Sequence, residues 1–127
     1  MAALPLNVFK TKTAVLTANT TTVVYVAPVG VTSIILMANV ANISTATQYV
    51  TMAHYRNLPV LPDSQGNGGQ AANVTTEIVK QFALPSNDSA NVIQGKLIIE
   101  QLDRVIAYAN TTATCKLILS VLETANS

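Results

Sequence analysis

The strongest constraint on the fold is a succession of short β-branched runs, each ended by Asn, Thr, Pro or Gly. Val, Ile and Thr favour strands because their branched side chains pack well on a pleated sheet. Runs of this kind at a spacing of about 8–12 residues are typical of an all-β sandwich or barrel. We therefore expect strands over residues 9–17, 22–27, 31–43, 48–55, 74–82, 91–93, 96–101, 105–109 and 114–123.

The pattern predicts an all-β antiparallel β-sandwich of about eight or nine strands, either jelly-roll-like or immunoglobulin-like. The 127 residues suit a single domain over 1–127, with a short N-terminal arm over 1–8. A long loop is expected over 56–73, where two prolines and a glycine-rich run interrupt the β pattern. Loops of this length are usually functional or disordered. We favour an arm that orders against a neighbouring subunit over a mobile surface excursion.

Two of the expected strands are apolar on both faces. A half-exposed antiparallel strand should instead alternate apolar and polar residues. Such strands are either covered on both sides by the fold or form an interface with another protein, and both explanations stay open here. The two faces are Ile34, Leu36, Ala38 and Val40 against Ile35, Met37 and Ala41, and Cys115, Leu117, Leu119 and Val121 against Ile118 and Leu122.

The low charge of the chain bounds its partners. Only 10% of the residues are charged and the net charge is +1, whereas about a quarter is usual. A weakly charged surface promotes association. The seven basic residues are scattered and matched by six acidic ones, so no nucleic acid is expected as a partner.

Neither a membrane nor an oxidising compartment is expected from the sequence. The apolar stretch from Ile34 to Val40 is interrupted by Asn39 and is far shorter than a membrane span. The first residues lack a signal-peptide pattern, and a single cysteine cannot form an intrachain disulfide. We therefore expect assembly in a cytoplasm.

No catalytic residue, cofactor or metal site is expected. His54 is the only imidazole and has no carboxylate or nucleophile beside it in the sequence, so a packing or interface histidine is preferred. Cys115 is in phase with the apolar residues of the last segment and should behave as a small core hydrophobe. The six carboxylates do not form the closely spaced set of a calcium loop, and no Lys-Ser/Thr follows the glycine-rich run.

Several short motifs resemble a known group of proteins. They are Leu16–Thr22 followed by Val24–Ile34, then Ala38–Asn42, Gly95–Glu100 and the closing Leu117–Glu123. Together they resemble small β-sandwich virion structural proteins of tailed bacteriophages, of the cyanophage-like capsid decoration or neck/tail-associated kind. The resemblance implies a virion location and other virion proteins as partners, namely a major capsid or neck/tail protein.

These observations predict a non-enzymatic structural component of a phage particle. It would act by multi-copy protein–protein assembly and form a homo-oligomer, in which repeated weak contacts sum through multivalency. The N-terminal segment could add a strand to a neighbour's sheet edge. The candidate assembly contacts are Leu4, Leu6, Val8, Phe9, Arg56, Leu58, Val60, Leu61, Ile118 and Leu122.

A glycan- or receptor-binding module of a phage fibre is the alternative. Sandwich folds host such sites on their end loops, and Tyr49, Tyr55 and Tyr108 could supply stacking surfaces. The small share of aromatic residues, 5% with no Trp, counts against it. A small hydrolase ranks last, because no catalytic constellation is recognisable.

Overall fold

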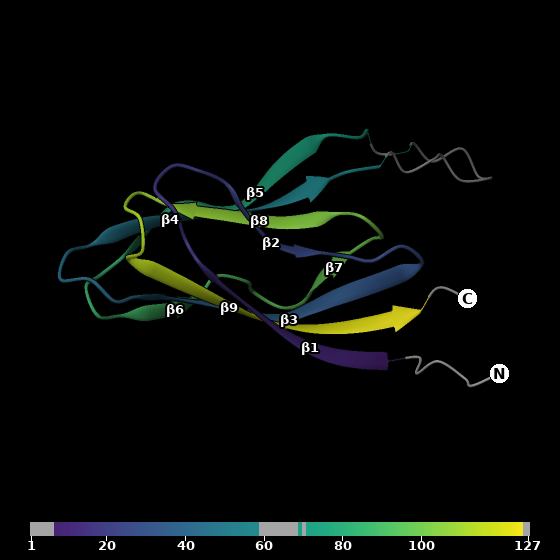
Figure 1. Cartoon of the computed structure of the whole chain (residues 1–127), viewed down its shortest axis with the longest axis horizontal. Coiled ribbons are helices and arrows are strands. Elements are labelled where there is room, and N and C mark those ends of the chain that lie inside the picture. The colour runs from purple at the N-terminus through teal and green to yellow at the C-terminus, as the bar shows by residue number, and fades with distance from the viewer. Residues whose placement is uncertain (1–6, 59–68, 70, 126–127) are drawn as a thin grey trace.

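A computed structural model gives the fold and describes residues 7–58, 69 and 71–125. These residues form nine strands, shown in Figure 1. No helix long and apolar enough to span a membrane occurs among them. The strands are β1 (Asn7–Val15), β2 (Thr22–Val26), β3 (Val31–Asn42), β4 (Gln48–Arg56), β5 (Val74–Leu84), β6 (Ser89–Asn91), β7 (Leu97–Ile99), β8 (Arg104–Ala109) and β9 (Cys115–Ala125).

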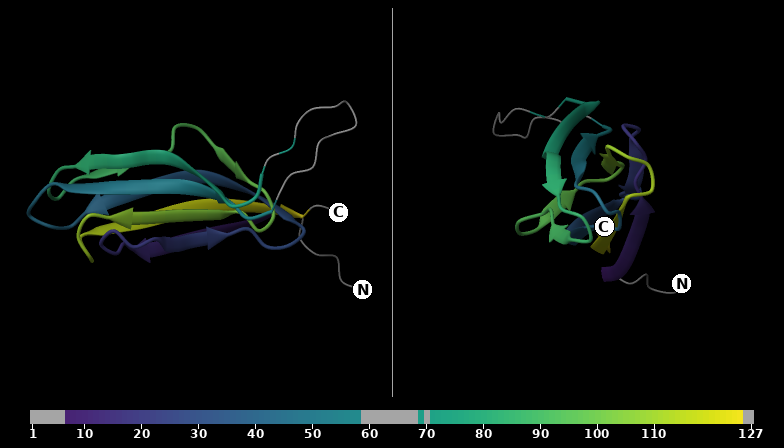
Figure 2. Two further views of the ribbon diagram at one scale, coloured as in Figure 1. Left: turned by 90° about the horizontal axis from the view of Figure 1, so that it is seen from above. Right: turned by 90° about the vertical axis from the view of Figure 1, so that its left-hand side faces the viewer.

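The strands make two antiparallel sheets that pack face to face (Figure 2). One sheet has the order β1-β9-β3-β6, with β7 also paired to β3, and the other has the order β2-β8-β4-β5. The pairs are nested: β1 with β9, β2 with β8, β3 with β6 and β7, and β4 with β5. This nesting is the strand pairing of a double-sheet jelly roll and differs from the immunoglobulin order. The predicted all-β sandwich is confirmed, in its jelly-roll form.

The core lies between the sheets and follows the alternation of the strands except in β3, where the predicted faces are wrong. The β3–β9 register shifts between Ile35 and Met37, so Ala38 and Val40 lie on the buried face with Ile35 and not on the face of Ile34. In β9 every second residue from Cys115 to Val121 is buried. Within the same sheet, these residues lie opposite buried residues of β3, namely Leu117 opposite Val40, Leu119 opposite Ala38 and Val121 opposite Ile35. β4 and β8 complete the core from the opposite sheet with Val50, Met52 and Val105. Cys115 is fully buried, as its phase predicted.

One predicted strand is displaced. The segment expected over 91–93 is a strand over Ser89–Asn91, and Val92 and Ile93 turn inward and are buried. Asn91 ends the strand because its side-chain oxygen accepts a hydrogen bond from the backbone N–H of Ile93 at 3.2 Å. Local side-chain bonds of this kind compete with the sheet ladder.

The ends of the expected arm and loop belong to strands. β1 begins at Asn7, so the last two residues of the arm expected over 1–8 are in the sheet. Arg56 is the last residue of β4, and its carbonyl accepts a hydrogen bond from Asn73 N–H at 2.6 Å. Residues 1–6, 59–68 and 70 lie outside the described part of the chain.

Candidate assembly face and two polar sites

The face of the β1-β9-β3-β6/β7 sheet that points away from the other sheet, here called the outer face, carries a row of apolar side chains. The register places Phe9 opposite Leu122, Leu122 opposite Ile34, and Ile34 opposite Ile98. Residues directly opposite each other share a face and lie close together. The four side chains therefore form one continuous apolar row across β1, β9, β3 and β7. At its two ends Phe9 is 73% and Ile98 is 61% exposed.

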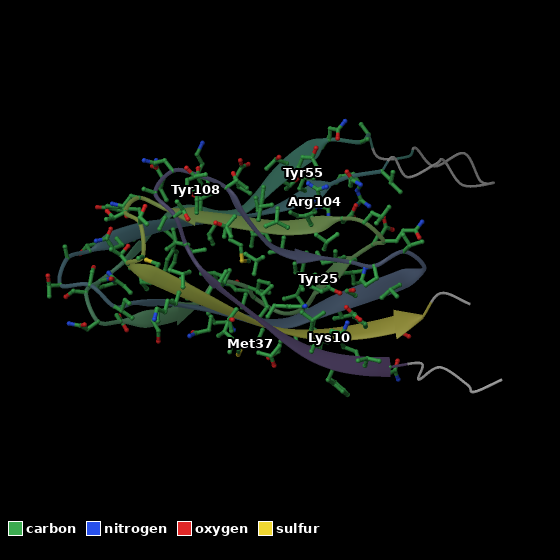
Figure 3. All side chains as sticks on the ribbon, in the orientation of Figure 1. Lys10, Tyr25, Met37, Tyr55, Arg104 and Tyr108 are labelled. Carbon is green, nitrogen blue, oxygen red and sulfur yellow. The ribbon has the colours of Figure 1, made fainter. Side chains whose placement is uncertain are left out.

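The rest of the outer face is nearly free of charge. Beside the apolar row the register aligns Thr11, Ser120 and Met37, the last of which is labelled in Figure 3. The next row along the strands, beyond Thr11, aligns Thr13, Ile118 and Asn39. Among the outward residues of the described strands of this sheet, Lys116 is the one charged side chain. The centres of protein interfaces are depleted of charge in the same way.

The outer face also has a shallow hollow of about 300 Å³ between β1, β9 and β3. Thr13, Asn39, Lys116 and Ile118 contribute to its lining. The two explanations left open for the doubly apolar segments are thereby partly resolved. The inner faces of β3 and β9 are core, and their outer apolar residues are covered by no part of the chain that the structure describes.

The predicted contact residues do not all reach this face. Phe9, Ile118 and Leu122 lie on it, whereas Val8 lies opposite Glu123 on the inner side of β1 and is half-buried. Leu58 is 40% exposed where the long loop begins, and Arg56 is held in ion pairs. Leu4, Leu6, Val60 and Leu61 lie outside the described residues.

A polar cluster lies directly beneath the apolar row, between the two sheets. The hydroxyl of Tyr25 on β2 donates to Glu123 Oε2 at 2.5 Å and is 2.6 Å from Ser33 Oγ (Figure 3). Lys10 Nζ lies 3.0 Å from Glu123 Oε1. Glu123, Ser33 and Tyr25 are all buried. At this end of the sheet, charged groups thus point inward while the apolar row points outward.

Burial and hydrogen bonding shift both acidic groups of this cluster. Burial raises the pKa of Tyr25, and the carboxylate of Glu123 raises it further. Burial acts to raise the pKa of Glu123 as well, but the hydrogen bond from Tyr25 and the charge of Lys10 outweigh it and hold that pKa below its ordinary value. Glu123 is therefore a carboxylate that accepts from Tyr25 and pairs with Lys10.

A second cluster surrounds Asp103, at the end of the molecule where the long loop begins. Asp103 is buried, and its Oδ2 lies 3.1 Å from His54 Nε2 and 2.8 Å from an Arg56 guanidinium nitrogen. Arg56 also pairs with Glu100, and Asn57 N–H donates to Asp103 Oδ1 at 3.3 Å. His54 has no carboxylate beside it in the sequence, but the fold supplies one, because the β4–β8 pairing brings the start of β8 next to His54.

This cluster has the partners of a structural site. One buried carboxylate is shared by His54, Arg56 and a backbone N–H, so each of its two oxygens has a partner. In the described part of the chain, His54 makes no hydrogen bond to a serine, threonine or cysteine that it could activate. No group of three or more His, Cys, Asp or Glu side chains among the same residues could hold a metal ion.

The three tyrosines expected to supply stacking surfaces separate into two places. Tyr49 and Tyr108 line one pocket of about 290 Å³, together with Asn19, Thr51, Gln81 and Asn110. Tyr55 lies toward the other end of the same sheet, where Arg104 stacks over its ring at 5.6 Å (Figure 3). The Tyr49/Tyr108 pocket lies on the β2-β8-β4-β5 sheet, opposite to the sheet that carries the outer face.

One signal for these sites was present in the sequence. Glu123 continues the phase of Leu119 and Val121, and an acidic residue in phase with a core face indicates a buried carboxylate with a partner. No comparable signal marks Asp103 or Gln81. Their neighbours come from strands far along the chain, and local periodicity carries no information on such pairings.

The fold and its surfaces define an all-β jelly-roll domain with an apolar, almost uncharged sheet face. Neither a protein-family model nor a curated protein sequence matches the chain. Among solved structures, one from Bacillus endospore appendages, which form a novel family of disulfide-linked pili, matches with a TM-score of 0.47 and 13% identity. The match covers 100% of this chain and 98% of the other.

The resemblance to phage virion proteins is wrong by these findings. No family match supports it, and the solved structure that matches over the full length comes from a bacterial spore appendage. The virion partners and the virion location implied by that resemblance are corrected with it. Of the short motifs that suggested it, Leu117–Glu123 lies within β9, and Gly95–Glu100 contains β7 and the bend before it.

Proposed function

We propose that this protein is a non-enzymatic structural subunit that assembles with copies of itself through the outer face. The observation that carries the proposal is the apolar row of Phe9, Leu122, Ile34 and Ile98, aligned by register across four strands. Exposed apolar area that is contiguous and rimmed by neutral polar residues marks an interaction surface. Scattered exposed apolar residues would carry no such meaning.

The sheet edge is a poorer candidate for the contact than the face. Among the described strands β1 pairs with β9 alone, so its other side bonds to no strand that the structure describes. However, Lys10 and Lys12 point inward from this edge strand, opposite Val121 and Leu119. Inward-pointing lysines are a common means by which edge strands avoid pairing with another chain. We therefore assign the contact to the flat of the sheet.

The composition supports association with a second copy over a charged partner. A face with one positive side chain, Lys116, and a chain with a net charge of +1 offer little electrostatic complementarity to an acidic or basic protein. Two copies of the same apolar face are complementary to each other, as an isologous contact requires. An assembly of many copies would then be built by repetition of this contact together with further contacts between the chains.

The test is the mass of the full chain in solution by light scattering over a concentration series. Ile98→Asp places a charge in the apolar row, and we expect it to shift the association to at least tenfold higher concentration. Val29→Asp is the matched control, because Val29 is similarly exposed, at 72%, but lies in the turn between β2 and β3. A wild-type monomer at all concentrations, or equal effects of both variants, would refute the proposal.

A further inference from the structure

We propose that the pocket between Tyr49 and Tyr108 binds a neutral saccharide. The pocket is formed by β4 and β8 with a side chain from β5, and Asn19 and Asn110 close it from two turns. Its volume of about 290 Å³ is close to the lower limit of ligand pockets, about 300 Å³. That size suits a mono- or disaccharide unit of a longer chain.

The placement of the aromatic rings is the first argument. The chain has six aromatic side chains, four Tyr and two Phe, and two of them line this pocket. Tyr49 is 45% exposed, so its ring is not part of the core. The negatively polarised face of an aromatic ring attracts the C–H groups of a sugar ring, and its hydroxyl can bond to the ligand.

The polar lining is the second argument, because it is neutral and has free groups. Asn19, Thr51, Gln81 and Asn110 supply amides and a hydroxyl, and no lining residue carries a charge. Asn110 Oδ1 accepts from Tyr49 N–H at 2.8 Å, which fixes the amide and leaves its NH₂ group to donate. Among the described residues, the structure gives no partner to the Gln81 amide or to the hydroxyls of Tyr49 and Tyr108. Sugar hydroxyls are donors and acceptors that match such groups.

The backbone around the pocket is also unusual. Gln81 and Asn19 have φ values of +50° and +48°, in the left-handed region that non-glycine residues rarely adopt. Gln81 lies where the β4–β5 register shifts, and its N–H donates to Thr51 Oγ1 at 3.0 Å. Bulges in β-strands often re-aim a side chain beside a functional site. Here the bulge brings Gln81 to the rim of the pocket.

A proline-rich peptide is the competing occupant, since such peptides also dock on aromatic-lined grooves. The lining favours the saccharide. Three side-chain amides surround the rings, from Asn19, Gln81 and Asn110, and a proline-rich peptide has too few N–H donors to pair with their oxygens, whereas a sugar has a hydroxyl on most of its carbons. The position of the pocket is compatible with the proposed assembly. It lies on the sheet opposite the outer face, so an assembled array would present many copies, and weak sites would act together.

The test is affinity electrophoresis of the full chain in native gels that contain a single polymer. The neutral probes are β-1,4-glucan, α-1,4-glucan, β-1,4-mannan and chitin oligomers. Polygalacturonate serves as the acidic probe, and a proline-rich peptide is titrated separately by tyrosine fluorescence. We expect retardation by at least one neutral polymer and none by polygalacturonate. Retardation by no neutral polymer, or binding of the peptide alone, would overturn the proposal.

Variants connect the retardation to the pocket. Tyr108→Ala and Tyr49→Ala should weaken binding about tenfold or more, and Tyr108→Phe should retain most of it because the ring remains. Tyr55→Ala is the matched control, a tyrosine of the same sheet outside the pocket, and should bind like wild type. Equal binding by all four variants would refute the assignment. Light scattering on the same samples reports assembly separately, so the two proposals can fail independently.

Discussion

Shortening Phe9 to alanine should weaken self-association without weakening the fold. An aromatic side chain can bury roughly 150–250 Å², and Phe9 is 73% exposed, so about 110–180 Å² of it stays in water in the single chain. At about 25 cal/mol per Å², full burial in an assembly would contribute about 3–4.5 kcal/mol. Ordering and imperfect packing at interfaces reduce that figure. We therefore expect a loss of about 2 kcal/mol, or a thirtyfold weaker dissociation constant.

Sedimentation velocity over a hundredfold range of concentration measures this change for Phe9→Ala. Val29→Ala removes a comparably exposed apolar side chain away from the outer face and should leave the dissociation constant unchanged. Urea unfolding at low concentration should give both variants the stability of the wild type within about 0.5 kcal/mol, as for other surface changes. If Phe9→Ala associates as tightly as the wild type, the apolar row is not the contact.

Three further predictions concern the interior. Because the pKa of Glu123 is lowered by folding, its carboxylate stabilises the folded state above its ordinary pKa of 4.5, and this stabilisation is lost as the pH falls below that value. The free energy of urea unfolding, measured against pH, should show this loss in the wild type and a flatter dependence in Glu123→Gln. Asp103→Asn should cost about 3 kcal/mol in the same assay, because His54 and Arg56 lose their shared carboxylate. The Cys115 thiol, whose pKa burial raises, should react with Ellman's reagent only when the chain is unfolded, and rapid reaction of the native protein would contradict its buried place.

The strands could be predicted because each contains its own evidence. Alternation from Cys115 onward marks the inner face of β9, and β-branched runs and turn residues mark the other strands. In β3 alternation holds only as far as Ile35, because a register shift before Met37 changes which residues face the core. The predicted strand ends were wrong where a single side-chain hydrogen bond ends the strand, as that of Asn91 does at the end of β6. The outward place of Ile118 and Leu122 could be predicted from phase alone.

The sites could not be predicted in the same way, because they depend on pairings between distant segments. Tyr25 meets Glu123 across 98 residues, and His54 meets Asp103 across 49. The patterns of two strands do not show whether the strands are neighbours in a sheet. A shift of the pairing register by one residue would also move every side chain of a strand to the other face. The Tyr49/Tyr108 pocket depends in addition on a bulge at Gln81, a residue type that does not signal a left-handed backbone.

The arrangement at the end of the first sheet argues that folding and association are coupled. The ion pair between Lys10 and Glu123 is partly exposed, since 41% of the Lys10 side chain is in water, and ion pairs of this kind add little net stability. Phe9 and Ile98 meanwhile remain in water in the single chain. Burying the apolar row in an assembly would supply the stabilisation that this end lacks.

Anything that binds only the folded state raises its stability by mass action. For an associating chain, a hundredfold rise in concentration above the dissociation constant adds about 2.7 kcal/mol, which corresponds to roughly 5 °C or more in Tm for a domain of this size. We expect calorimetry to show this rise for the wild type and for Val29→Asp, whereas for Ile98→Asp the rise should begin only at a concentration at least tenfold higher. A wild-type Tm that does not depend on concentration would mean that the end of the sheet is stable alone and that its apolar row has another purpose.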